Sequence, residues 1–121
     1  MNARLSWPIW VGVVVDDFEA QRRFYRDTLG FVETDASDGW AQFDVDGDLF
    51  ELMPRVSDPP FETRSYQVSF AVEDIEGARN ELIAAGVTPL GEIEGGPDQP
   101  YRWCYFRDPE GNAFGITQRV R

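Results

Sequence analysis

The chain contains no histidine and no lysine, since all eleven of its basic residues are arginine. Without histidine there is no Ser-His-Asp triad, no histidine general base and no histidine metal ligand. Without lysine there is no Schiff-base chemistry. The single cysteine excludes an intrachain disulfide and a cysteine-rich metal site.

Long hydrophobic runs are missing as well. No apolar stretch approaches the roughly 20 residues that a membrane span needs, and the first six residues do not resemble a signal peptide, so we expect a cytoplasmic protein. The net charge of −11 disfavours nucleic acid and anionic membranes as partners and favours cationic ligands. The 121 residues, 42% of them hydrophobic, suffice for one domain and are too few for two ordinary ones.

The sequence repeats itself. The run VGVVVDD, which ends at Asp17, has the same form as VSFAVED, which ends at Asp74. Each run leads into a helix-like stretch whose first turn the aspartate can cap. Gly30 and Gly86 suit the left-handed position just after the last turn. The pattern predicts one helix after each of the two runs.

Further segments match in the same order. The strand-like run WAQF at 40–43 corresponds to WCYF at 103–106, and LFEL at 49–52 corresponds to AFGI at 113–116. Within each half of the chain, a glycine turn separates the first of these runs from the second. We therefore predict an α+β fold of two βαβββ repeats. The predicted organisation is a single domain over 1–121, with repeat one at 7–53, a linker at 54–65 and repeat two at 66–118.

Two segments also resemble a known family. Residues 15–31 (VDDFEAQRRFYRDTLGF) are similar to the helix pattern D…A…FY…LGF, and residues 106–112 (FRDPEGN) to the DP-G-N hairpin, of the glyoxalase/bleomycin-resistance/dioxygenase superfamily, the vicinal oxygen chelate fold. The resemblance implies a curved mixed sheet around a central cavity, with the helices on the outer face, and a homodimer. This fold hosts isomerases, epimerases, dioxygenases, transferases and drug-binding proteins, so the resemblance does not fix the activity.

The family's enzymes chelate a metal ion with four residues from the first and last strands of each half. The resemblance places these positions at Trp10, Glu51, Gln67 and Gly115. An indole offers only an N–H donor, glycine has no side chain and glutamine binds weakly through one oxygen, so only Glu51 is a competent anionic ligand. We therefore expect no metal site and no cofactor.

The alternation of side chains along the strands assigns the lining of the expected cavity. One face of each strand is apolar and should pack against a helix, and Cys104 on that side is predicted to be an inert, buried thiol. The residues predicted to bind a ligand on the other face are Trp10, Trp40, Glu51, Met53, Gln67, Ser69, Trp103, Tyr105 and Arg107. Gly12 and Gly115 on the same face are expected to leave room where the family's enzymes hold their metal.

This lining favours a metal-independent protein that sequesters a planar aromatic, cationic small molecule such as an antibiotic, as the bleomycin-resistance proteins do. Indole faces stack on flat rings and attract cations, and Glu51 can pair with an amine or guanidinium. In that interpretation no residue is catalytic.

Three other interpretations stay open. A metal-free isomerase, epimerase or cyclase would use Glu51 as its general base, because an apolar cavity raises the pKa of a carboxyl group. A metal-dependent lyase or dioxygenase would need ligands from outside the family's positions. The aromatic side chains would otherwise only fill the space of a lost metal.

Overall fold

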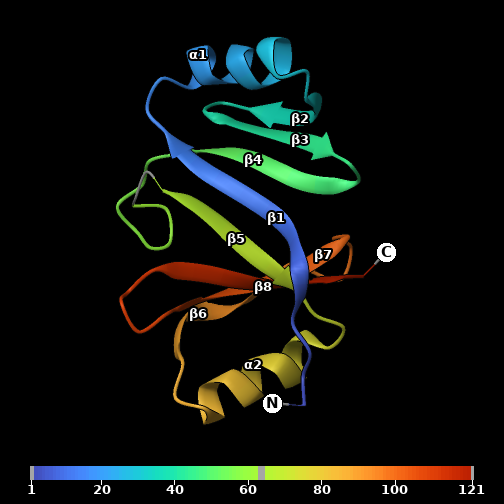
Figure 1. The fold of residues 1–121 in the computed structure, drawn as a ribbon, viewed down its shortest axis with the longest axis vertical. Coiled ribbons are helices and arrows are strands. Elements are labelled where there is room, and N and C mark those ends of the chain that lie inside the picture. Colours follow the sequence, from blue (N-terminus) through green and yellow to red (C-terminus); the bar gives the residue numbers. More distant parts are fainter. Residues whose placement is uncertain (1, 63–64, 121) are drawn as a thin grey trace. The chain divides into compact units, whose positions relative to one another are not determined.

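The computed structural model describes residues 2–62 and 65–120. They form two compact units, one of residues 10–67 and the other of residues 2–9 together with residues 68–120. The order strand, helix and three strands occurs twice along the chain, once in blue to green and once in yellow to red in Figure 1. The α+β class and the repeated βαβββ order are therefore confirmed.

The first repeat contains four strands and a short helix, and a π-helical turn follows the helix directly. Its elements are β1 (Ser6–Val15), α1 (Phe18–Arg23), the turn η1 (Phe24–Thr28), β2 (Val32–Ser37), β3 (Trp40–Val45) and β4 (Asp48–Pro54). Strand β4 pairs in parallel with β1 and antiparallel with β3, and β3 pairs antiparallel with β2.

The second repeat has the same pairing pattern. Its elements are β5 (Tyr66–Ala71), α2 (Ile75–Ala84), β6 (Thr88–Glu94), β7 (Tyr101–Arg107) and β8 (Ala113–Arg119). Strand β8 pairs in parallel with β5 and antiparallel with β7, and β7 pairs antiparallel with β6. In the described part of the chain, no helix is both long and apolar enough to cross a membrane.

Both helices begin and end where the sequence predicts. The Oδ1 atoms of Asp17 and Asp74 accept hydrogen bonds from backbone N–H groups in the first turns, each at 3.2 Å. Gly30 and Gly86 follow the helical segments with φ angles of 76° and 89°, a conformation that glycine adopts without steric cost. The structure adds the π-helical turn η1, in which the Phe24 carbonyl accepts from the Leu29 N–H at 3.0 Å.

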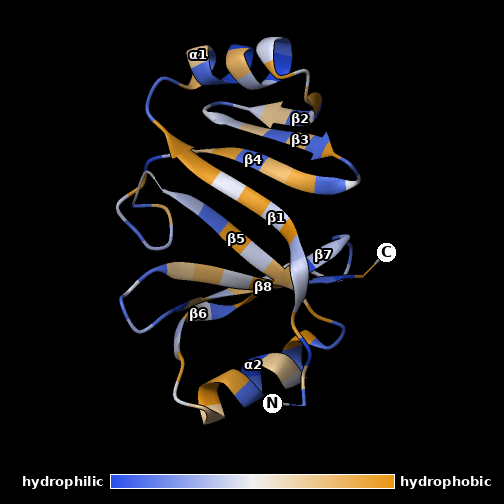
Figure 2. Cartoon of the chain, viewed as in Figure 1, coloured by the Kyte–Doolittle hydropathy of each residue, from blue (hydrophilic) through white to orange (hydrophobic). Residues whose placement is uncertain are grey.

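The side of each strand array that packs on its helix is apolar, as the alternation predicts. In the first unit this core contains Val13, Val15, Tyr25, Ala41, Phe43, Phe50 and Leu52. In the second unit it contains Val72, Ile75, Ala78, Leu82, Cys104, Phe106 and Ile116. Figure 2 shows hydrophobic residues along much of β1. The predicted burial of Cys104 is confirmed, since its side chain has no exposed surface. Burial raises the pKa of the thiol to about 11, which agrees with the expected low reactivity.

The cap of α2 provides a test of how far local signals stabilise this fold. Replacing Asp74 by alanine removes the side-chain acceptor of the Gly77 N–H and is expected to lower the free energy of unfolding by about 1 kcal/mol. The matched control is Asp98→Ala, the same change in an exposed loop, which should alter stability by less than about 0.5 kcal/mol. Urea unfolding followed by circular dichroism measures both, and equal effects would contradict the capping role.

Candidate functional site

Glu51 lies at the centre of the sheet face that points away from α1. It sits on β4, opposite Gly12 of β1 and Gln42 of β3. The indole Nε1–H of Trp40 donates to its Oε2 at 2.9 Å, and the indole of Trp10 donates to the same carboxyl group. Two tryptophans that are 30 positions apart in the sequence thus hold one carboxylate.

The electrostatic environment of Glu51 is unusual for a carboxylate. Burial raises its pKa above its usual range, and the hydrogen bonds from the two indoles counter part of this shift. Both donors are neutral, so they stabilise the negative charge without balancing it. A buried carboxylate held in this way is favourably placed to take up a cation or a proton.

The space above Gly12 is filled, which corrects one expectation. A Cβ atom on Gly12 would lie 2.4 Å from Cζ2 of Trp10 and 2.7 Å from Cε of Met53. Without a side chain at Gly12, the neighbouring indole can lie back over the strand, and only 7% of Trp10 is exposed. The prediction that Gly12 leaves room on this face is therefore wrong, because Trp10 and Met53 occupy that space.

The segment predicted as a linker contributes to this face. Phe61 packs against the cluster of Trp10, Val14 and Met53, beside Trp40 and Leu49. Gln67 is also tied to the segment, since its amide Nε2 donates to the carbonyl of Pro60. Its Oε1 atom is buried without a hydrogen-bond partner among the described residues. Phe61 is not among the residues that the sequence predicts for this face, and its position close to three prolines was the only available signal.

The second unit carries its own set of predicted residues. Ser69 and Thr117 share a buried hydrogen bond between their hydroxyl groups at 2.5 Å. In the pairing of β7 with β8, Tyr105 lies opposite Gly115 and Trp103 lies opposite Thr117. These side chains occupy one face of the sheet because alternate residues point the same way.

The structure adds two details of this face, the first of which corrects an expectation. The space above Gly115 is occupied, because a Cβ atom there would lie 2.7 Å from the Ser69 hydroxyl oxygen. The guanidinium of Arg107 donates to the Gly111 carbonyl at 2.7 Å, which ties it to the β7–β8 turn. The prediction that Gly115 leaves room on this face is therefore wrong, because the Ser69 side chain lies in that space.

The residues present do not fit a divalent metal ion. The described residues contain no group of three or more histidine, cysteine, aspartate or glutamate side chains that could hold one. The Trp10 indole nitrogen has no lone pair to give, Gly115 has no side chain, and the Glu51 carboxylate already accepts from two indoles. Glu51 and the amide of Gln67 would have to bind the ion alone, which is fewer ligands than such sites use.

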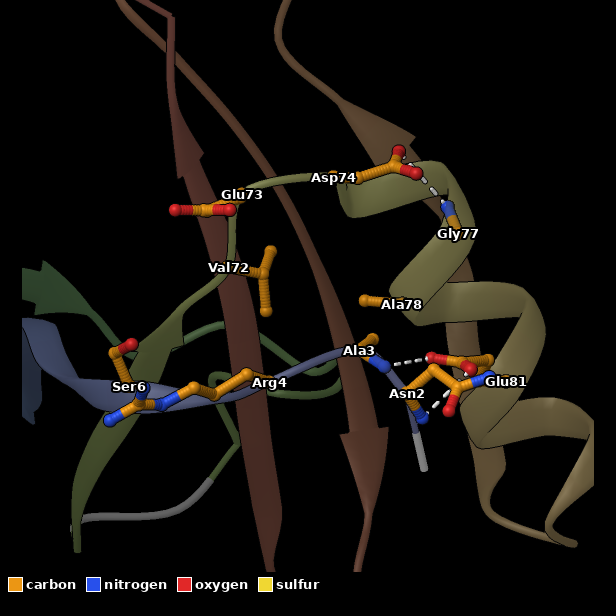
Figure 3. Close-up of a pocket in the computed structure, with 10 residues that line it drawn as sticks. All are labelled: Asn2, Ala3, Arg4, Ser6, Val72, Glu73, Asp74, Gly77, Ala78 and Glu81. Carbon is orange, nitrogen blue, oxygen red and sulfur yellow. Dashed lines mark hydrogen bonds between the residues drawn. The ribbon is translucent and has the colours of Figure 1, made fainter.

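A pocket of about 640 Å³ lies within the second unit, between the N-terminal segment and α2 (Figure 3). Two of the acidic side chains that line it already serve the fold. Glu81 accepts from the backbone N–H groups of Asn2 and Ala3, and Asp74 caps α2. The Glu81 bonds fasten the N-terminal segment to α2, so we assign the carboxylates of Glu81 and Asp74 a structural role.

The family follows from a direct match. Residues 7–116 match the model of the Glyoxalase/Bleomycin resistance protein/Dioxygenase superfamily. The match covers most of the chain, so this protein belongs to that superfamily. No curated protein matches the chain.

Solved structures show the same fold at low sequence identity. A Mn(II)-bound glyoxalase from Novosphingobium aromaticivorans matches with a TM-score of 0.77 and 20% identity, over 98% of this chain but only 40% of that one. A variant of methylmalonyl-CoA epimerase from Streptomyces coelicolor, in complex with 2-nitronate-propionyl-CoA, matches with a TM-score of 0.69 and 20% identity over 98% and 100% of the two chains. A superfamily member from Vibrio splendidus 12B01 matches with a TM-score of 0.65 and 18% identity, over 98% of this chain and 100% of that one.

Proposed function

We propose that this protein is a metal-independent binding protein that sequesters a planar aromatic cation, such as an antibiotic, at the Glu51 face of the first unit. The observation that carries the proposal is the Glu51 carboxylate, which is buried and held by the indoles of Trp10 and Trp40. A cation supplies the balancing charge that these neutral donors lack. The flat faces of the indoles add stacking and cation–π attraction.

The net charge of the protein supports the same ligand class. At −11, the chain attracts cations from solution and repels anions of the same shape. Met53 and Gln67 are further proposed binding residues of the first unit. Ser69, Trp103, Tyr105 and Arg107 are proposed binding residues of the second unit. The homodimer and the cytoplasmic location remain predictions, which sedimentation and cell fractionation test.

The proposal is tested with acridine orange, a planar cation, and fluorescein, an anion with a planar xanthene ring. We expect the cation to bind and to quench the tryptophan fluorescence, and the anion to do neither. Glu51→Gln should weaken cation binding about 10- to 150-fold, because a hydrogen bond to a charged group contributes about 1.5–3 kcal/mol. Isothermal titration calorimetry measures both dyes.

The matched control is Glu92→Gln, the same change at a carboxylate whose side chain is 88% exposed in the second unit. This variant should bind acridine orange as the unmodified protein does. Equal losses in the two variants would mean that only the net charge matters, and no binding of the cation would overturn the proposal.

A second candidate function is supported by the raised pKa of Glu51. A carboxyl group whose pKa is raised by burial is a stronger base when ionised, which suits proton abstraction in an isomerase, epimerase or cyclase. Glu51 would take the proton, while its hydrogen bonds from Trp10 and Trp40 hold the carboxylate in position. Because Glu51 itself accepts the proton, this reaction needs no metal ion as the base.

Deuterium exchange separates the two functions. Methylmalonyl-CoA is the first compound to try, because an epimerase that acts on it has the same fold over its full length. An enzyme would introduce solvent deuterium into the compound, and Glu51→Gln would slow this exchange by about 10²–10⁴-fold. A protein that only binds would show no exchange above the uncatalysed rate.

A further inference from the structure

The indole of Trp10 occupies the space beside Glu51 that a ligand needs. Its ring lies over Gly12 and against the methyl group of Met53, and Phe61 packs on the same cluster. Its N–H also donates to the Glu51 carboxylate. A flat molecule that reaches Glu51 from above Gly12 therefore has to displace this ring.

Displacement of the ring removes a donor from a buried carboxylate. An acceptor that loses its hydrogen bond away from water becomes costly, and the cost is larger for a charged group. The Trp40 indole remains bonded to Oε2 of Glu51, since it comes from β3 on the other side of β4. The lost donor is the one that Trp10 supplied.

A ligand can restore that bond only if it carries an N–H group of its own. A protonated amine, amidine, guanidine or ring nitrogen places a hydrogen on the carboxylate and brings a positive charge as well. A quaternary or fully alkylated cation brings the charge alone, and leaves the vacated acceptor unsatisfied.

We propose that Trp10 determines the specificity of this site: a ligand displaces the indole and replaces its N–H group, so that the protein selects planar cations with an N–H donor over planar cations without one. The inference rests on the proposed function, because it concerns the same Glu51 site. It adds a chemical requirement for the ligand that stacking and charge do not impose.

A pair of dyes isolates this requirement. Acridine orange carries a proton on its ring nitrogen, and its ring-N-methylated derivative has the same plane and charge with a methyl group in that place. We expect the protonated dye to bind at least tenfold more tightly in calorimetric titrations. If both dyes bind equally, the inference is wrong while the proposed function stands. If neither binds, the proposed function fails and the inference fails with it.

The position of the Trp10 ring is followed directly by NMR of the four indole N–H groups. On addition of acridine orange, the Trp10 resonance should move towards that of Trp7, whose side chain is 86% exposed, and the Trp40 resonance should keep its hydrogen-bonded shift. An unmoved Trp10 resonance in a saturated complex would show that the ligand does not displace the ring, and would overturn the inference.

Trp10→Phe gives a third readout. Phenylalanine keeps an aromatic ring over Gly12 but has no N–H group, so the ligand no longer competes with an existing hydrogen bond. The affinity for acridine orange should rise about three- to tenfold, whereas a site in which Trp10 stays in place would lose affinity. The matched control is Trp7→Phe, the same change at an exposed position, which should leave the affinity unchanged.

Discussion

Replacement of Phe106 by alanine is expected to lower the free energy of unfolding by about 3–5 kcal/mol. The Phe106 side chain has no exposed surface and stacks on Phe114, with ring centroids 5.7 Å apart and planes at 26°. It lies in the core between α2 and the strands of the second unit, beside Ile75 and Ile116. Because domains of this size are stable by only about 5–15 kcal/mol, the variant should be close to unfolding at 37 °C.

Urea denaturation, followed by circular dichroism, measures this loss. The matched control is Phe24→Ala, the same truncation at a side chain that is 44% exposed on η1, which should cost less than about 1 kcal/mol. A loss of similar size in both variants would contradict the assignment of Phe106 to the centre of the core.

Binding of acridine orange is expected to weaken in mildly acidic solution. Burial raises the pKa of Glu51, so the carboxyl group takes up a proton at a higher pH than an exposed glutamate does. Below that pKa, a proton occupies the group that the cation needs. The affinity should then fall about tenfold for each further pH unit, because proton and cation compete for one site.

Calorimetric titrations over a range of pH measure this dependence, and the dye stays cationic throughout. Glu51→Gln should bind more weakly at neutral pH and show no such decline, because its amide does not titrate. A decline of the same size in Glu51→Gln would assign the proton to another group and contradict the role of Glu51.

The stability of the protein gives an independent check on the same pKa. The native protein holds the Glu51 proton at pH values where the unfolded chain has released it. The contribution of Glu51 to the free energy of unfolding therefore decreases as the pH rises from the usual glutamate pKa through the raised native value. Asp27, Glu33 and Asp108 have lowered pKa values and act in the opposite direction. Their effects cancel when the unmodified protein is compared with Glu51→Gln.

Local patterns in the sequence were sufficient for the class of fold. The repeated runs that end at Asp17 and Asp74 predict both helix starts, since a capping aspartate acts on the N–H groups of the next turn. The period of two along the strands predicts which side chains enter the cores, including Phe43 and Phe106. These features depend on neighbours within a few residues, so a single chain is enough to find them.

The arrangement at Glu51 was decided by the tertiary structure. Strand alternation places Trp10, Trp40 and Glu51 on one face, but it does not say where a side chain lies once it leaves its strand. The Trp10 ring lies back over Gly12 and Phe61 packs beside it, and both depend on segments brought together only by folding. The sequence by itself therefore determined the repeats, the caps and the faces of the strands. The filling of the space above Gly12, and with it the environment of the carboxylate, followed from three-dimensional packing, because side-chain volumes compete for space only after the strands have paired.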